Sequence, residues 1–279
     1  MKKTIAITGA TSGLGLITAR TLIKEGWNVL VLARNRQKAE KHFDFSAGTG
    51  ASFVSCDLSS LSSVSKAAKQ VRANTDQLDV LLNNAGGILE QRELSEDGIE
   101  MTFQMNHLGH FLLTTKLMDL LIRSRTRIIN VSSAAHQAGR LVLDDINWEN
   151  RKYNSMRAYG DGKLCNIYFT RELHRRFNDQ GITSFCLHPG VVRTNFFDEI
   201  SGGLTKLLVG VMQPFMISPK KGAATQIYLA TENGKLDKHS GEYFVKRKPA
   251  RTSAVARNEF HARRLWEKSE ELVSSFLQD

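Results

Sequence analysis

The sequence of 279 residues predicts an α/β fold in which one doubly wound parallel sheet is flanked by helices on both faces. Short β-branched runs alternate with amphipathic stretches, which is the order expected of a parallel sheet with right-handed crossovers. The first run ends in a glycine-rich loop, Thr8 to Gly15, that leads directly into a helical pattern. No linker divides the chain, so residues 1–279 are predicted to form a single domain.

About seven strands are predicted, and helical patterns fill the gaps between them. The strands are expected at Thr4 to Thr8, Asn28 to Ala33, Ala51 to Ser55, Val80 to Asn83, Arg127 to Val131, Thr183 to His188 and Glu242 to Val245. The longer helices are expected at Gly13 to Glu25, Ser62 to Thr75, Gly98 to Ile122 and Ser155 to Phe177. Ligands of such sheets bind at the carboxyl ends of the strands, so the loops after each strand are expected to carry the function.

The composition excludes several classes of protein. Hydrophobic residues make up 41% of the chain, enough for a sizeable core, and the formal net charge is +10. Three cysteines without CxxC spacing argue against a disulfide framework or a zinc site and indicate a reducing compartment. The apolar run near the N-terminus ends at Thr8, too early for a signal peptide or a membrane span. We therefore expect a cytoplasmic protein with no metal site.

The glycine-rich loop has the pattern of a phosphate cradle. A strand that stops in such a loop and restarts as a helix directs backbone N–H groups and the positive end of the helix dipole at one place. The candidate contacts with a pyrophosphate are Gly9, Thr11, Ser12, Gly13, Leu14 and Gly15. For a glycine triplet alone, an ordinary strand-to-helix turn is the alternative.

The loops after the next three strands complete a predicted dinucleotide site. Arg34 follows the second strand, where an enzyme selective for NAD usually carries an acid, so Arg34 could pair with a 2′-phosphate, helped by Arg36 or Lys38. This favours NADP(H) over NAD(H), unless the charges only solvate a helix start. Asp57, beside Leu58, could accept a hydrogen bond from an adenine amino group. Asn84, Ala85 and Gly86 end the fourth strand.

A tyrosine and a lysine point to the chemistry. Tyr159 and Lys163 are four residues apart in a predicted helix, so they lie on one side of it, and no other tyrosine is followed by lysine at this spacing. We expect the ammonium and a positively charged nicotinamide ring to lower the phenol pKa, so that Tyr159 can exchange a proton. Ser133 would orient a carbonyl oxygen, and Asn106 could hold a water that links Lys163 to solvent. A plain surface pair is the alternative reading of the spacing.

From Lys3 to about Phe244 the sequence resembles the short-chain dehydrogenases/reductases. The motifs that carry the resemblance are TGATSGLG at Thr8, CDL at Cys56, NNAG at Asn83, Asn106, NVSS at Asn130, YxxxK at Tyr159 and HPGVVRT at His188. The resemblance implies a Rossmann-type fold and a catalytic tetrad of Asn106, Ser133, Tyr159 and Lys163. It also implies cofactor contacts from Tyr159 and Lys163 and from the turn with Pro189, Gly190, Val192 and Thr194.

Within this family, four segments are similar to the retinol dehydrogenase and WW-domain oxidoreductase subgroup: MNHLGHF, VSSAAH, GKLCNIYFTREL and LWEKSEEL. That subgroup mostly reduces carbonyls with NADPH. Many relatives form dimers or tetramers through the helices that include Gly98 to Ile122 and Ser155 to Phe177, so the resemblance implies a homo-oligomer. One departure from the family is Gly162, where a serine or threonine is usual. With Gly160 it puts two glycines, each costing about 1 kcal/mol, into one helical turn. We therefore expect that the helix is locally loose at this turn or that substrate approaches its backbone closely there.

Residues 194–219 are rich in apolar side chains and are predicted to form a substrate lid, with a core helix or a subunit contact as alternatives.

The basic segment 246–264 holds seven basic residues and one acidic residue. It could bind an acidic partner or a membrane surface, but a solvated tail is the common outcome, and it lacks the interleaved aromatics that nucleic-acid binding would require. The stretch from Glu259 to Phe276 is predicted to form a final amphipathic helix, within the C-terminal part 246–279, that docks on the body or on another subunit.

The sequence therefore predicts an NADP(H)-dependent oxidoreductase that interconverts a bulky apolar ketone or aldehyde and its alcohol. Tyr159 is the expected general acid/base. The alternative is a non-catalytic dinucleotide-binding sensor or scaffold protein.

Overall fold

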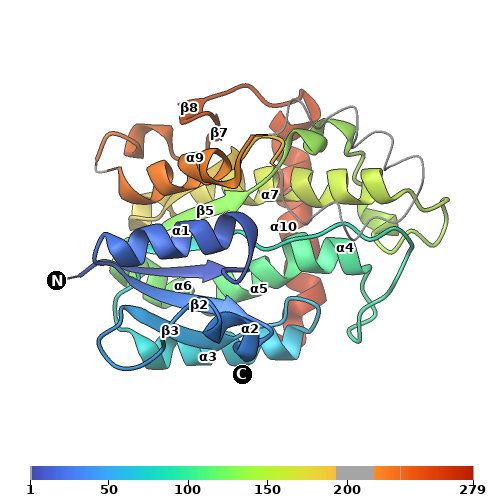
Figure 1. Ribbon diagram of the computed structural model, residues 1–279. Helices are drawn as coiled ribbons and strands as arrows, with labels where there is room; N and C mark the ends of the chain where they lie inside the picture. The colour runs from blue at the N-terminus through green and yellow to red at the C-terminus, as the bar shows by residue number, and fades with distance from the viewer. Residues whose placement is uncertain (1, 193–216, 233, 279) are drawn as a thin grey trace.

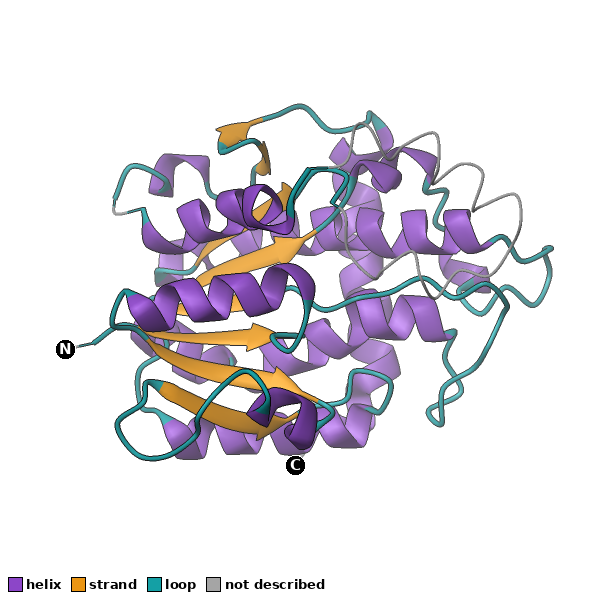
Figure 2. Ribbon diagram, viewed as in Figure 1, coloured by secondary structure: helices purple, strands orange, loops and turns teal. Residues whose placement is uncertain are grey.

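The computed structural model describes residues 2–192, 217–232 and 234–278, and it contains one sheet of eight strands with helices on both faces (Figures 1 and 2). The strand order is β3-β2-β1-β4-β5-β6-β7-β8. Strands β1 to β7 run parallel, and β8 is antiparallel to β7. The order of connection reverses between β1 and β4, which is where sheets of this class bind ligands. The predicted fold class is confirmed.

The strands are β1 (Thr4–Thr8), β2 (Asn28–Ala33), β3 (Ala51–Ser55), β4 (Val80–Asn83), β5 (Arg127–Val131), β6 (Thr183–His188), β7 (Tyr243–Val245) and β8 (Lys248–Pro249). The α-helices are α1 (Gly13–Lys24), α2 (Arg36–Glu40), α3 (Leu61–Asn74), α4 (Met101–Phe103), α5 (Gly109–Lys116), α6 (Met118–Ser124), α7 (Ser155–Phe177), α9 (Pro219–Thr231) and α10 (Glu259–Leu277). Shorter helices that matter for the site are the π-helix η1 (Gln104–Leu108) and the 3-10 helices η2 (Ala134–Ala138) and η3 (Leu143–Asp145).

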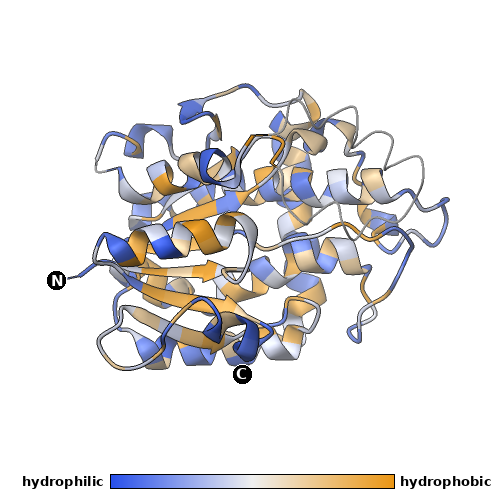
Figure 3. Cartoon of the chain, viewed as in Figure 1, coloured by the Kyte–Doolittle hydropathy of each residue, from blue (hydrophilic) through white to orange (hydrophobic). Residues whose placement is uncertain are grey.

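The core lies on both faces of the sheet, whose strands are largely apolar (Figure 3). Side chains alternate between faces along a strand, so Ile5 and Ile7 of β1 join the cluster under α1 and α9, whereas Ala6 joins the cluster under α3, α5, α7 and α10. A strand buried on both sides has no polar face, which explains why the predicted strands read as continuous apolar runs.

Two elements differ from the prediction. The expected helix from Gly98 to Ile122 is divided into α4, η1, α5 and α6. The π-helix lies where Asn106 and Gly109 were expected to disturb the helix, so a local irregularity is confirmed there. The eighth strand was missed because it has only two residues, one of them Pro249, and proline is tolerated on an edge strand.

The C-terminal helix α10 docks on the body of the protein, which decides between the two expected placements. Trp266 packs edge-on against Phe111 of α5, with ring centroids 4.9 Å apart, and also contacts Phe169 of α7. Ser269 accepts a hydrogen bond from His107 Nε2 at 2.9 Å. The helix therefore backs the elements that carry the candidate site. Of the helices described, none is both long enough and apolar enough to cross a membrane.

Candidate active site

The glycine-rich loop joins β1 to α1 with geometry that fits a pyrophosphate. Gly9 and Gly13 have φ of +68° and +51°, in the left-handed region that favours glycine. A Cβ on Gly15 would lie 2.5 Å from the Gly9 carbonyl oxygen, so α1 can begin this close to the loop only with glycine at this position. Ser12, the N-cap residue of α1, makes no side-chain capping bond. The first-turn N–H groups of α1 therefore keep their capacity for an anion.

Thr8 joins this loop to the strand beside it. Its Oγ1 accepts hydrogen bonds from the backbone N–H groups of Asn84 and Ala85 at 2.9 and 3.0 Å. The Asn84 side chain donates to the Thr8 carbonyl at 2.9 Å, so it positions the loop. Thr8 Oγ1 also meets His110 Nε2 at 2.9 Å, and His110 Nδ1 lies 3.2 Å from the Asn106 carbonyl. Burial lowers the His110 pKa to about 3, so this bridge is neutral.

Thr8 and His110 were not predicted as site residues. A hydroxyl at the end of an apolar strand was the only signal for Thr8. For His110, the partner on the glycine-rich loop, Thr8, lies 102 residues away in the sequence, so no local pattern pointed to the contact.

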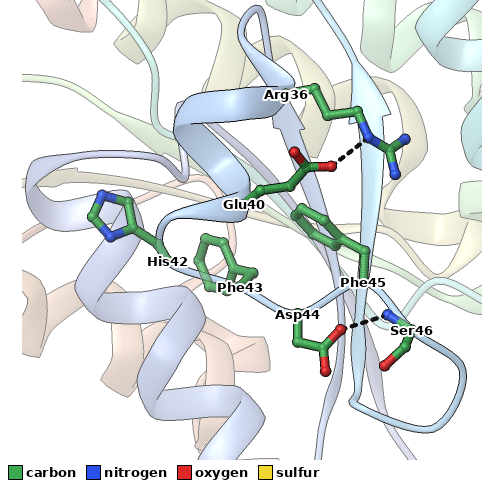
Figure 4. A pocket seen from close by; sticks show the side chains of 7 residues that line it. All are labelled: Arg36, Glu40, His42, Phe43, Asp44, Phe45 and Ser46. Carbon is green, nitrogen blue, oxygen red and sulfur yellow. Dashed lines mark hydrogen bonds and ion pairs between the residues drawn. The ribbon is translucent and has the colours of Figure 1, made fainter.

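The three cations predicted to meet a 2′-phosphate, Arg34, Arg36 and Lys38, follow β2 and have different surroundings. Arg36 pairs with Glu40 at 2.8 Å, and its guanidinium lies 5.5 Å from the Phe53 ring. Figure 4 shows this pair in the wall of a pocket beside α2, lined by Arg36, Glu40, His42, Phe43, Asp44, Phe45 and Ser46. Arg34 and Lys38 are exposed and have no acidic partner among the described residues. No acidic side chain of the described residues therefore competes with a ligand for Arg34.

The loop after β3 holds the carboxylate of Asp57 in a fixed position. Asp57 Oδ1 accepts hydrogen bonds from the Ser59 N–H and hydroxyl at 3.0 and 2.6 Å, which fixes the carboxylate. Leu58 is buried against Gly109 at the start of α5. The loops after β1, β2, β3 and β4 thus lie along one edge of the sheet, as predicted.

The predicted reactive pair lies on α7. Lys163 is 3% exposed, and its Nζ donates to the Val131 carbonyl at 3.2 Å and lies 5.4 Å from the centre of the Tyr159 ring. Ser133 caps η2 directly after β5, and its side chain hydrogen-bonds with Tyr159. The hydroxyl of Ser132 donates to the Lys163 carbonyl at 2.6 Å, which ties the end of β5 to α7. Ser133, Tyr159 and Lys163 are therefore brought together.

Asn106 faces the same space from the π-helix. Its Nδ2 donates to the carbonyls of Gly87 and Thr102 at 2.8 and 2.7 Å, whereas its buried Oδ1 has no partner among the described residues. A Cβ on Gly86 would lie 2.3 Å from this oxygen and 3.0 Å from Lys163 Nζ. A buried acceptor without a partner, beside an ammonium, is suited to a bound water or ligand.

The two unexpected glycines of α7 are explained by close packing. A Cβ on Gly160 would lie 2.8 Å from the Ala135 carbonyl oxygen and 3.0 Å from the Gly139 nitrogen, both backbone atoms. A Cβ on Gly162 would lie 3.0 Å from the Asn106 Cβ. The glycines therefore let α7 approach the serine turn on one side and the π-helix on the other. The close neighbours of this turn are thus protein backbone and Asn106, and the approach of a substrate to it stays a prediction.

Burial shifts the pKa values of this pair. It raises the pKa of Tyr159 to about 12, although the hydrogen bond from Ser133 acts in the opposite direction. Burial lowers the pKa of Lys163 to about 8. In the protein without cofactor, desolvation therefore sets the direction for Tyr159, and the lowering of the phenol pKa by the ammonium together with a positively charged nicotinamide ring stays a prediction.

The turn after β6 closes the other end of the predicted site. Gly190 has φ of +96°, and Val192 forms a parallel bridge with Ile217. A Cβ on Gly222 of α9 would touch both Val192 and Leu14, so this turn and the glycine-rich loop share a neighbour. Pro189 is part of the same turn. Thr194 and most of the predicted lid, 194–219, lie outside the described residues. The described part of the chain holds no group of three or more His, Cys, Asp or Glu side chains suited to a metal ion.

Known proteins resemble this chain over nearly all of its length. A family model described as short chain dehydrogenase matches residues 3–204. Retinol dehydrogenase 13 of Homo sapiens is 40% identical over 97% of this chain and 84% of its own length. The WW domain-containing oxidoreductase of Drosophila melanogaster is 34% identical over 99% of this chain and 69% of its own. A solved structure of an uncharacterized protein from Mycobacterium Paratuberculosis has a TM-score of 0.78 and 32% identity, covering 98% of this chain and 93% of that one.

Proposed function

The chain belongs to the short-chain dehydrogenase family and is similar to its retinol dehydrogenases, and from that premise we propose an NADP(H)-dependent oxidoreductase. It interconverts a bulky apolar ketone or aldehyde and the corresponding alcohol. The observation that carries the proposal is the meeting of Ser133, Tyr159 and Lys163 at the carboxyl edge of the sheet, with the unpartnered Asn106 Oδ1 beside them. A protein that only bound dinucleotides would have no use for these four side chains together.

Each of these side chains has a separate task in the proposed reaction. When bound, the nicotinamide supplies or accepts the hydride. The Tyr159 phenol donates a proton to the developing alkoxide, or accepts the hydroxyl proton in the reverse direction. Ser133 donates a hydrogen bond to the substrate oxygen and so orients it. The Lys163 ammonium stabilises the phenolate, and Asn106 Oδ1 holds a water through which the proton is replaced.

An apolar substrate is supported by the names of the relatives and by an exposed apolar side chain near Tyr159 on α7. Met156, one helical turn before Tyr159, is 51% exposed. Several relatives are retinol dehydrogenases, whose named substrate is a bulky apolar alcohol. The proposal therefore extends to large apolar carbonyls as a class.

Arg34 is the proposed determinant of NADP(H) binding. Nicotinamide fluorescence should report tighter binding of NADPH than of NADH. Arg34→Asp should weaken NADPH binding about 10- to 100-fold, the loss expected for one or two charge-assisted hydrogen bonds, and leave NADH nearly unchanged. Arg36→Gln is the matched control and should change NADPH affinity little, because Arg36 is already paired with Glu40. Equal affinities for the two cofactors in the wild type would contradict the proposed preference.

Tyr159→Phe separates the enzyme from the sensor or scaffold. The variant keeps the ring and loses the exchangeable proton, so turnover of apolar aldehydes should fall by about 10²- to 10⁴-fold. NADPH affinity should stay within about twofold of the wild type. Full turnover in Tyr159→Phe would contradict the proposed role of Tyr159 as general acid/base. A wild type that binds NADPH and reduces no carbonyl would favour the sensor or scaffold.

A further inference from the structure

The segment from Gly139 to Tyr153 lies between the serine turn and α7, and one buried carboxylate fastens it to α7. That carboxylate belongs to Asp161, two residues after Tyr159 and two before Lys163, and the residue is only 4% exposed. Its Oδ1 accepts a hydrogen bond from the Arg140 N–H at 2.6 Å. Its Oδ2 lies 3.7 Å from Arg151 Nη2 and has no hydrogen-bond partner among the described residues.

The bond to Arg140 lies next to the closest approach between α7 and the serine turn. Arg140 directly follows Gly139, whose nitrogen is one of the atoms that a Cβ on Gly160 would strike. The 3-10 helix η2, which begins at the Ser133 cap, ends at Ala138. Asp161 therefore holds the distal end of the serine turn against the helix that carries Tyr159.

Arg151 links Asp161 on α7 to residues of the segment from Gly139 to Tyr153. Its Nε lies 3.2 Å from Asp145 Oδ2, and its guanidinium stacks over the Trp148 ring, 3.6 Å from the centroid. Trp148 packs edge-on against Tyr153 with ring centroids 5.4 Å apart. The guanidinium is therefore fixed between two carboxylates and an indole face, a geometry that lysine would not reproduce.

The same contacts continue to the helix that leads to Asn106. Tyr153 donates a hydrogen bond to Glu100 Oε1 at 3.0 Å. The Glu100 carboxylate is buried and accepts from the N–H groups of Thr102 and Phe103 at 2.9 and 2.7 Å, so it caps α4. The π-helix with Asn106 follows α4 directly. An unbroken set of contacts thus joins Asp161 to the elements that carry Ser133 and Asn106.

We propose that Asp161 is a positioning residue that, through Arg140 and Arg151, sets the serine turn and the Asn106 helix against Tyr159. This proposal rests on the function proposed above, because its effect is a change in the rate of the Tyr159-dependent reaction. In this proposal Asp161 acts through the segment from Gly139 to Tyr153, which its contacts with Arg140 and Arg151 hold.

The charge of Asp161 makes the positioning sensitive to pH. Burial raises the pKa of its carboxyl to about 6, whereas the Arg140 N–H, Arg151 and Arg157 favour the ionised form and Glu100 opposes it. Above about pH 6 the carboxylate is ionised and attracts Arg151. Below that pH it becomes protonated and the ion pair is lost, so the positioning weakens as the pH falls.

The activity test compares kcat/KM between pH 5 and 8 in the wild type, Asp161→Asn and the matched control Asp179→Asn. Asp179 is exposed in the turn after α7. Asp161→Asn should lower kcat/KM about tenfold at pH 7.5, leave NADPH affinity unchanged and remove the decline of the wild type below about pH 6. Asp179→Asn should behave as the wild type. An Asp161→Asn enzyme with the pH profile of the wild type and only a lower melting temperature would overturn the proposal.

A second measurement needs no catalysis. In protein labelled with 5-fluorotryptophan, the ¹⁹F resonance of Trp148, assigned with Trp148→Phe, should titrate with a midpoint near pH 6. Asp161→Asn should abolish this titration. Arg151→Gln should move the midpoint upward by about one unit, because it removes a cation that favours the carboxylate. A Trp148 resonance that titrates in both variants with the midpoint of the wild type would overturn the proposal.

The two readouts separate the two claims. An inactive wild type whose Trp148 resonance titrates as described would support the Asp161 contact and contradict the proposed enzyme. An active wild type whose Trp148 resonance does not titrate would support the proposed enzyme and contradict the role of Asp161.

Discussion

Lys163 carries an ammonium in a site that excludes nearly all water. Burial lowers its pKa from 10.5 to about 8, so the unfolded chain binds more protons than the folded protein between those values. Stability rises with pH wherever the unfolded state binds more protons, so this group lowers the free energy of unfolding most at neutral pH and progressively less up to about pH 10.5. The residue is therefore kept at a cost in stability, which is typical of functional sites.

Lys163→Met should raise the free energy of unfolding at pH 7 by about 2 kcal/mol, somewhat less than the pKa shift alone implies, because the hydrogen bond to Val131 is lost. Turnover should be lost. The difference from the wild type should shrink as the pH rises from 8 towards 10.5. Denaturant titrations at three values of pH measure it, and a variant that is less stable at every pH would refute the assignment.

Gly160→Ala tests the close approach of α7 to the serine turn. Alanine gains about 1 kcal/mol in helix propensity, yet its Cβ meets two backbone atoms that can move only if the serine turn moves. Overpacking of this kind costs about 1–3 kcal/mol, so a net loss of stability and at least a tenfold loss of kcat/KM are expected. Ala158→Gly weakens the same helix without adding an atom, and it should keep kcat/KM near the wild-type value.

At this scale the sequence predicts a group of candidate residues, of which Ser133, Tyr159 and Lys163 lie together in the structure, but it does not predict the contacts that hold them. The spacing of Tyr159 and Lys163 alone predicts that they lie on one side of a helix. The direction of the phenol pKa depends on burial by distant segments, which no local pattern contains. The contacts of Asp161 also join positions that are neighbours only in the folded chain.

Among the elements, α10 shows how much of the site depends on packing between distant helices. Trp266→Ala should lower the free energy of unfolding by about 3–5 kcal/mol, because the indole is 3% exposed among Phe111, Phe169 and Phe177. Phe260→Ala on the same helix, at a side chain 63% exposed, should change it by less than about 0.5 kcal/mol. Urea unfolding of the two variants decides the matter, and equal effects would contradict the described packing.

The strands could be predicted because they are short apolar runs bounded by polar loops, and α7 because its apolar residues recur at helical spacing. The interrupted helix around Asn106 was predicted as an irregularity, but the partners of its side chains could not be predicted, because Gly87 and Ser269 come from separate segments. The edge strand β8 carries too few residues for any pattern.

For the whole molecule, α10 bears on the oligomer that the resemblance implies. The expected contacts between subunits involve the helices from Gly98 to Ile122 and Ser155 to Phe177, whereas α10 packs on α5 and α7 within this chain. We expect light scattering to report a monomer at micromolar concentration. A dimer whose cross-links map to α5 or α7 would contradict this expectation, and one that maps elsewhere would mean that another surface is used.

The bond between His107 and Ser269 also has a consequence for biosynthesis. Translation produces α10 after every other described element, whereas β1 and the glycine-rich loop are made near the start. A nascent chain in which β1 to β7 have been synthesised already contains the glycine-rich loop that is expected to bind a dinucleotide. The helix with Asn106 still lacks Ser269, which bonds with His107, and the indole of Trp266, because both belong to α10. Cofactor capture can therefore precede catalytic competence during synthesis, and the nucleotide could act as a folding template for its own enzyme.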